Sequence, residues 1–157
     1  MRFILLDRIT EWEPGKRGSA VKSVALSEDF FDDHFPLRPV LPGVLLLEGL
    51  AQLSGLLLEE GQRAQGGRSV KALMSVVEKA KFRKPVFPGD RLDLHAEVLS
   101  FNEAGGKVAA HATRDGEKLA ECTLVFSFHQ YEHPRLEQRR VEMLGLLLKD
   151  LAPDGRR

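Results

Sequence analysis

The sequence predicts an α+β domain in which an antiparallel sheet wraps around one long central apolar helix, with an extra helix at the C-terminus. Residues 44 to 58 are almost all apolar, as is typical of a helix buried on every side. After residue 70, several segments alternate apolar and polar side chains with the period of a β-strand, and short turn signals separate them. One buried helix followed by consecutive strands indicates the α+β class.

The central helix follows a stiff loop. Prolines at positions 36, 39 and 42 exclude a helix there, because proline fixes φ and restricts the residue before it. Pro42 is a suitable helix opener, and no proline interrupts residues 43 to 60. The polar side chains between residues 44 and 58 are Glu48, Gln52 and Ser54. Because this stretch is short and carries a carboxylate in its second turn, we expect a buried helix of a soluble domain, not a membrane span.

Turn signals and alternation place the strands. Residues 3 to 12 and 19 to 26, separated by the turn signal Pro14-Gly15, predict a strand, a turn and a strand. Residues 59 to 69 are polar and contain glycines at 61, 66 and 67, so we expect a flexible connection there. Further strands are predicted at residues 70–77, 80–86, 92–98, 108–113 and 120–128, with a hairpin turn at Asp115-Gly116.

Composition narrows the class of protein. A chain of 157 residues with 43% hydrophobic and 29% charged residues is typical of one soluble globular domain. Lysine plus arginine equals aspartate plus glutamate, at 23 each, so no global field favours nucleic acid or an anionic membrane. Asp7 and Arg8 interrupt the short apolar run at the N-terminus, which argues against a signal peptide. With one cysteine, no intrachain disulfide can form, and we expect a cytoplasmic protein.

Two side chains near the start of the central helix are candidates for acid–base chemistry. Burial without a partner should raise the pKa of Glu48, and a carboxylic acid kept protonated near neutral pH can donate a proton. The alternative is a structural acid paired with an arginine or lysine. A loop histidine such as His34 is more often structural. The combination is more specific, because His34 and Glu48 flank a helix start whose free amides at Gly43 and Val44 can bind a developing oxyanion.

The stretch from residue 31 to residue 52 closely resembles the FabZ-type 3-hydroxyacyl-[acyl-carrier-protein] dehydratases of fatty-acid synthesis. The matching residues are His34-Phe35-Pro36, Pro39, Pro42-Gly43-Val44, Glu48, Ala51 and Gln52, with the family's spacing of fourteen between the histidine and the glutamate. Further matches are residues 79–86 (KAKFRKPV), Pro88-Gly89-Asp90 and Leu6-Asp7-Arg8. The resemblance covers roughly residues 3 to 128. It implies a hot-dog dehydratase domain over residues 1–128, with residues 129–157 as a C-terminal extension.

The resemblance implies removal of water from a (3R)-hydroxyacyl thioester on acyl carrier protein, giving the trans-2-enoyl thioester. Neutral His34 would take a proton from C2, and protonated Glu48 would protonate the leaving hydroxyl on C3. The amides of Gly43 and Val44 would polarise the thioester carbonyl, and Gln52, one turn after Glu48, would orient its carboxyl. No metal or redox cofactor is required. The resemblance also implies a site formed across a homodimer, in which the histidine loop of one subunit meets the glutamate helix of the other, and dimers that can assemble into a trimer of dimers.

Other features have two interpretations each. Lys79, Lys81 and Arg83 form a basic face of a strand, which is either simply solvated or docks an acidic carrier protein. Pro134 opens a predicted helix with leucines at helical spacing. That helix covers apolar surface on its own domain or on a neighbouring subunit, or it docks a partner.

Three smaller signals are interpreted as structural. His129 and His133 have the spacing of metal ligands on a helix, but Pro134 argues against a helix there. His95 and His111 lie in predicted strands, and Cys122 lies on an apolar strand face.

Two rival functions remain open. A hot-dog acyl-thioesterase would use a helix carboxylate to hydrolyse the thioester, but the His34 loop argues against it. A non-catalytic acyl-binding or assembly subunit is the other rival, and the presence of both His34 and Glu48 argues against that one.

Overall fold

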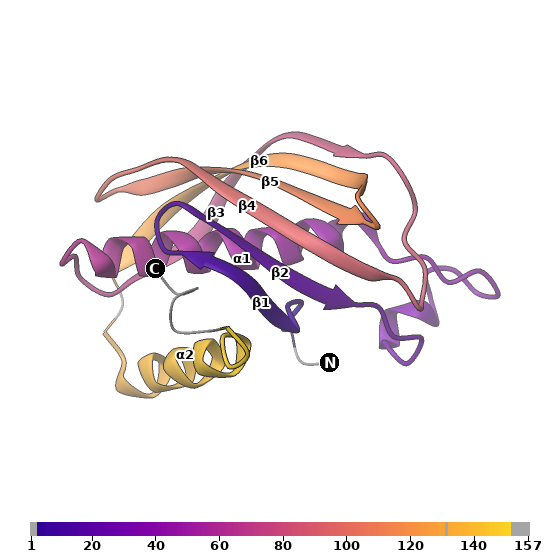
Figure 1. Cartoon of the computed structure of the whole chain (residues 1–157), viewed down its shortest axis with the longest axis horizontal. Helices are drawn as coiled ribbons and strands as arrows, with labels where there is room; N and C mark the ends of the chain where they lie inside the picture. Colours follow the sequence, from indigo (N-terminus) through magenta and orange to yellow (C-terminus); the bar gives the residue numbers. More distant parts are fainter. Residues whose placement is uncertain (1–2, 131, 152–157) are drawn as a thin grey trace.

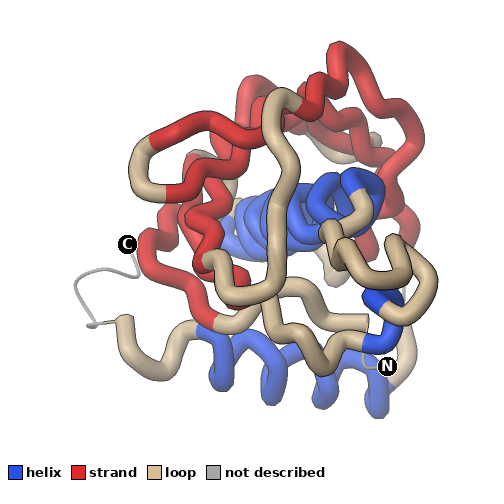
Figure 2. The backbone as a smooth tube through the Cα atoms, turned by 90° about the vertical axis from the view of Figure 1, so that its right-hand side faces the viewer, coloured by secondary structure: helices blue, strands red, loops and turns tan. Residues whose placement is uncertain are grey.

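A six-stranded antiparallel sheet curls around helix α1 (Gly43–Ala64), and helix α2 (Pro134–Leu147) lies against α1 on the side that the sheet leaves open (Figure 1 and Figure 2). The computed structural model describes residues 3–130 and 132–151. The strands follow the order β1-β2-β4-β5-β6-β3 across the sheet, so that β1 and β3 are its edges. Their bounds are β1 (Arg8–Glu13), β2 (Arg17–Ser23), β3 (Val70–Phe82), β4 (Arg91–Phe101), β5 (Gly105–Arg114) and β6 (Glu117–Gln130). This arrangement confirms the predicted α+β class.

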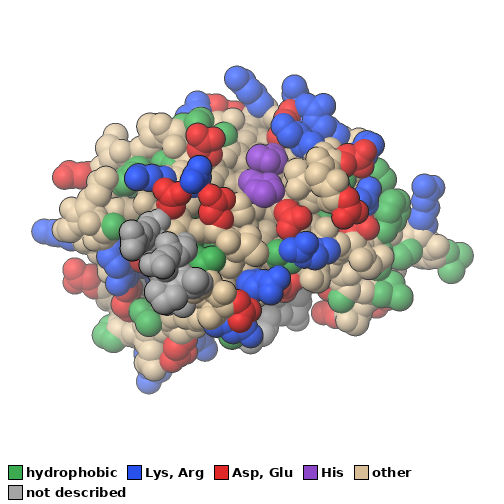
Figure 3. Space-filling view, in the orientation of Figure 1, with side chains coloured by type: hydrophobic (Ala, Val, Ile, Leu, Met, Phe, Trp, Pro, Cys, Tyr) green, Lys and Arg blue, Asp and Glu red, His purple; other side chains and the backbone are tan. Residues whose placement is uncertain are grey.

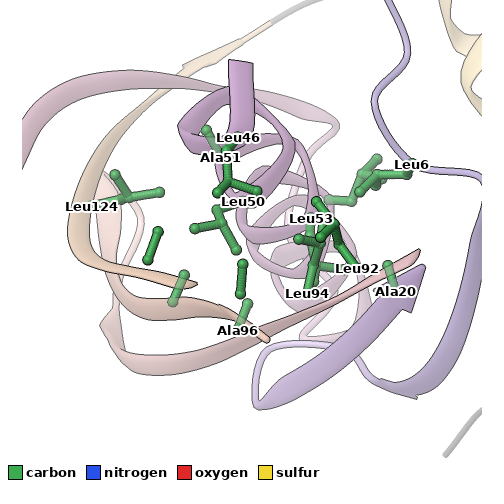
Figure 4. Close-up of a cluster of buried hydrophobic side chains, with 14 of the residues drawn as sticks. Leu6, Ala20, Leu46, Leu50, Ala51, Leu53, Leu92, Leu94, Ala96 and Leu124 are labelled. Carbon is green, nitrogen blue, oxygen red and sulfur yellow. The ribbon is translucent and has the colours of Figure 1, made fainter. Parts of the chain in front are cut away.

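The core lies between α1 and the concave face of the sheet. Leu50, Leu53 and Leu57 of α1 are fully buried, because the helix is apolar on the face that the sheet wraps. They meet the inward-pointing side chains of the strands, which alternate with outward-pointing ones. Figure 4 shows part of this cluster, with Leu46, Leu50, Ala51 and Leu53 from α1 facing Leu92, Leu94 and Ala96 of β4, Ala20 of β2 and Leu124 of β6.

Helix α1 is longer than predicted. It runs to Ala64, so the first six residues of the expected connection at 59–69 are helical. Glu59 at this end is buried and has partners inside the protein: its Oε1 accepts a hydrogen bond from the Ala72 amide at 2.9 Å, and its Oε2 lies 3.2 Å from Arg140 Nε of α2. The sequence pattern suggested a loop because these tertiary partners, far away in the chain, cannot be seen in it.

The prediction of two strands at residues 70–77 and 80–86 was wrong. The structure has one strand, β3, with irregular pairing against β6 between Glu78 and Lys81. Lys79, at φ 52°, takes the left-handed conformation that lets a bulge interrupt the ladder without ending the strand. The strand ends at Phe82, although the Arg83 and Lys84 amides still donate to the Leu119 carbonyl of β6. Further along, the Val86 carbonyl accepts from the Leu41 amide at 2.8 Å.

Residues 3 to 7 precede β1 instead of belonging to it, which corrects the predicted first strand. Leu5 and Leu6 are buried, and the Leu5 amide donates to the Gln52 side chain of α1 at 2.9 Å. This apolar segment therefore lies against the central helix.

The predicted C-terminal helix is present as α2, with Pro134 in its first turn. Leu144 and Leu147 are buried in the core cluster, so that α2 covers apolar surface of its own chain. Arg140 forms ion pairs with Glu59 and Glu60 of α1. No helix in the described ranges is long and apolar enough to cross a membrane.

Candidate active site

His34 lies on the loop between the short 3-10 helix (Asp29–Phe31) and α1. Backbone hydrogen bonds close this loop: the His34 amide donates to the Phe30 carbonyl at 3.0 Å, and the Val40 amide donates to the His34 carbonyl at 2.9 Å. The His34 ring stacks on Phe35, with 4.1 Å between ring centroids. The proline-rich sequence thus forms a loop with a fixed shape, as its composition predicts.

The side chain of His34 is oriented as a proton acceptor. Its Nδ1 lies 2.7 Å from the Val40 carbonyl oxygen. A carbonyl can only accept a hydrogen bond, so the neutral ring carries its proton on Nδ1 and has a lone pair on Nε2. No group within the described residues bonds Nε2. His34 is half-buried, beside a cavity of about 280 Å³ that Gly43, Phe82 and Val86 also line.

The first turn of α1 borders the same cavity. The Pro42 carbonyl accepts hydrogen bonds from the Leu45 and Leu46 amides. Pro42 provides no side-chain cap, and the amides of Gly43 and Val44 precede the first intrahelical bonds. These two amides are therefore available to a ligand oxygen. Gly43 also lies against Phe82, since a Cβ at this position would come within 3.1 Å of the Phe82 ring.

Glu48 lies on another face of α1, one turn before Gln52. The Gln52 Nε2 donates to Glu48 Oε1 at 3.1 Å and to the Phe3 carbonyl at 3.3 Å. The Gln52 Oε1 accepts from the Leu5 amide, which fixes the amide orientation so that its NH₂ group faces Glu48. Glu48 is half-buried, less than the all-apolar pattern of the helix predicts, because its face of α1 borders a cavity.

Within one chain, His34 and Glu48 lie in different cavities. The cavity at Glu48 measures about 380 Å³ and lies between α1, β3, α2 and the segment before β1. Its lining includes Gln52, Met74 and Phe126, whereas His34 belongs to the smaller cavity at the helix start. The two groups therefore share a helix but do not share a site within the single chain.

The three basic residues predicted as one face are separated in the structure. Lys79 and Lys81 are exposed, line a shallow cavity over β5 and β6, and make no ion pair within the described residues. Arg83 lies beyond the end of β3, lines the His34 cavity and pairs with Glu121. The bulge at Lys79 breaks the period of two that the prediction assumed.

His95 and His111 stack on the outer face of the sheet, with 4.8 Å between ring centroids. Figure 3 shows histidine side chains together on this face, with acidic and basic side chains around them. Burial, followed by the charges of His95 and Lys118, lowers the pKa of His111.

No group of three or more His, Cys, Asp or Glu side chains in the described part of the chain is placed to hold a metal ion. Buried Cys122 has its pKa raised to about 11 by burial, as expected of a core thiol.

Sequence reasoning missed two contributions to the cavities. Phe82 lines the His34 cavity, although its strand position gave no sign of it. Met143 and Leu147 of α2 line the Glu48 cavity. Their helical spacing indicated a covering helix, but the sequence does not say what lies under it.

Known proteins resemble this chain in sequence and in fold. A model of a FabA-like domain matches residues 1–127. The 3-hydroxyacyl-[acyl-carrier-protein] dehydratase FabZ of Acetivibrio thermocellus is 44% identical over 128 residues, which is 80% of this chain and 84% of that one. The protein of the same name from Myxococcus xanthus is 45% identical over 119 residues, covering 76% and 77%. The dehydratase heterocomplex ApeI:P from Xenorhabdus doucetiae matches in fold, with a TM-score of 0.66 at 17% identity, covering 88% of this chain and 90% of that one.

Proposed function

The chain belongs to the FabZ-type dehydratases of the FabA-like family, and from this premise we propose that it removes water from (3R)-hydroxyacyl thioesters carried on acyl carrier protein, giving trans-2-enoyl thioesters for fatty-acid synthesis. The observation that carries the proposal is the His34 ring, whose Nδ1–H is held by the Val40 carbonyl so that Nε2 faces away as a base. We place the dehydratase domain at residues 1–128, the extension at residues 129–157, and the protein in the cytoplasm.

The proposed reaction uses three groups. His34 Nε2 removes the proton from C2 of the acyl chain, and the carbonyl oxygen takes up the negative charge. The Gly43 and Val44 amides, at the positive end of α1, stabilise that oxygen. Glu48 donates a proton to the C3 hydroxyl, which leaves as water, and Gln52 holds the carboxyl in position.

A composite site explains why His34 and Glu48 do not share a cavity. Edge strand β3 pairs with β6 on one side and leaves its other side open. Four of its apolar side chains are strongly exposed: Leu73 at 50%, Met74 at 40%, Val76 at 47% and Val77 at 40%. A long apolar edge is a template for pairing with a second copy, and a two-fold axis would make the contact self-complementary. We propose a homodimer across β3, in which His34 of one subunit meets Glu48 of the other, and further assembly into a trimer of dimers.

Carrier docking is proposed at Lys79, Lys81 and Arg83. Lys79 and Lys81 have no ion-pair partner in the described ranges, so their charges are available to an acidic carrier. Arg83 borders the His34 cavity, where the thioester would enter.

The experiment is mass spectrometry of 3-hydroxyacyl carrier protein incubated with the wild type, His34→Ala or Glu48→Gln. The wild type should remove one water, and each variant should lower the rate by about 10²–10⁴-fold. Gln138→Ala, on an exposed position of α2, is the matched control. Release of free carrier thiol would identify a thioesterase instead. Unchanged mass with the acyl carrier still bound would identify a binding subunit.

A further inference from the structure

The cavity at Glu48 continues along α1, away from the proposed chemistry. Glu48, Gln52, Gly55 and Glu59 line it, and their spacing of four, three and four places them on one face of the helix. At about 1.5 Å per residue this face spans about 16 Å. The volume of about 380 Å³ is in the ordinary range for a small-molecule site. The space is therefore an elongated, mainly apolar channel beside the acid.

Helix α2 forms one wall of this channel. Met143 and Leu147 line it, opposite strand β3, where Leu73 and Met74 line the other side. Leu147 is 3% exposed and belongs to the core cluster, while Met143 is half-buried against it. The FabA-like match ends at residue 127, so both side chains lie in the segment that the match does not cover.

The far end of the channel is charged. Glu59 and Lys71 line it there, with Glu59 Oε1 3.3 Å from Lys71 Nζ. Arg140 of α2, 8% exposed, lies 3.2 Å from Glu59 Oε2 and also pairs with Glu60. Binding an apolar acyl chain against these charged groups would be unfavourable in free energy, because the acyl chain would displace their polar partners. The same ion pairs hold α2 against α1.

We propose that α2 sets the acyl-chain length of this enzyme, with Met143 and Leu147 as specificity-determining side chains and the Glu59–Arg140 pair as the closed end of the channel. The acyl chain extends from Glu48 along α1, between α2 and β3, and its methyl end stops short of Glu59. This inference rests on the proposed dehydratase function, since it assigns the channel to the substrate of that reaction.

The test compares chain-length profiles. Dehydration is measured on 3-hydroxybutyryl, 3-hydroxydecanoyl and 3-hydroxyhexadecanoyl carrier proteins for the wild type, Met143→Trp, Met143→Ala and Leu147→Phe. Met143→Trp and Leu147→Phe narrow the channel, so the ratio of long-chain to short-chain kcat/KM should fall about tenfold or more, because a short acyl chain needs less of the channel than a long one. Met143→Ala widens the channel, and the ratio should rise.

Val141→Trp is the matched control, because Val141 lies on the same helix and is 58% exposed. It should keep the wild-type profile. Thermal unfolding confirms that each variant is folded, and Met143→Ala provides an answer even if the larger side chains destabilise α2. Equal loss on all chain lengths, or an unchanged profile, would overturn the role of α2 while leaving the dehydratase intact. A wild type that dehydrates none of the three substrates would overturn the proposed function itself.

Discussion

Gln52 shows how one residue connects distant parts of the chain to the proposed acid. Its side chain bonds the Leu5 amide, the Phe3 carbonyl and Glu48, so the segment before β1 determines which end of the amide faces the carboxyl. The helical spacing of Gln52 and Glu48 was visible in the sequence. The partner at Leu5, 47 residues away, was not, because it depends on how the N-terminal segment lies on α1.

Gln52→Leu should lower kcat by about tenfold to a hundredfold, because a hydrogen bond to a charged or proton-donating group is worth about 1.5–3 kcal/mol. KM should change less than kcat, since leucine is similar in size to glutamine and can still line the channel beside the acyl chain. Steady-state kinetics on one acyl carrier substrate measures both constants. A rise in KM with unchanged kcat would contradict a positioning role.

His111 should make stability depend on pH. Burial and the charges of His95 and Lys118 lower its pKa in the folded state below the ordinary value of 6.5. Below about pH 6.5 the unfolded chain therefore binds a proton that the folded chain does not, and stability falls as pH decreases through this window.

Urea unfolding between about pH 7 and pH 5 checks this prediction. His111→Gln should lose less stability over the interval than the wild type. His129→Gln, at an exposed position near the end of β6, is the matched control and should behave as the wild type does. An equal pH slope for the wild type and His111→Gln would contradict the assignment.

At the scale of elements, α2 is joined to α1 by ion pairs that include two buried charged side chains. Glu59 and Arg140 are both almost fully buried, so removing Arg140 leaves the Glu59 carboxylate with Lys71 as its remaining ion-pair partner in the described ranges. Arg140→Met should lower the free energy of unfolding by about 3–5 kcal/mol. The double variant Glu59→Gln/Arg140→Met should lose less than the sum of the two single losses, because neither charge then remains.

Chemical denaturation of the four proteins of this cycle measures the coupling. Arg139→Met, at an exposed position of the same helix, is the control and should change stability by less than about 0.5 kcal/mol. Additive losses in the double variant would show that the two side chains do not act as a pair.

The elements themselves were largely predictable, and the exceptions have a common cause. The central helix, most strands and the C-terminal helix follow from periodicity and proline positions. The last turns of α1 and the continuous β3 were missed because tertiary contacts decide them: Glu59 finds Arg140 and the Ala72 amide, and β6 holds β3 together across the bulge at Lys79. For the proposed active site, the sequence motif pointed to His34 and Glu48. It could not show that the two side chains line separate cavities of one chain.

At the scale of the whole molecule, the proposed composite site makes a direct prediction. A mixture of inactive His34→Ala and Glu48→Gln subunits should recover activity after they are allowed to exchange. Half of the randomly formed dimers contain one of each, and each of those has one intact site, so about a quarter of wild-type activity is expected. The measurement is the dehydration rate before and after exchange. No recovery in a mixture shown to contain mixed dimers would contradict a shared site.

The position of β3 beside β6 also constrains how the chain can fold during synthesis. β3 ends at residue 82, but its neighbour in the sheet begins at residue 117, and α2 follows later still. Until those segments leave the ribosome, the apolar face of α1 has neither β6 nor α2 to cover it. The first three-quarters of the nascent chain, up to residue 116, therefore cannot complete the core, which forms only after β6 has been synthesised. A truncated product ending before residue 117 should accordingly be a substrate for chaperones and proteases, not a folded domain.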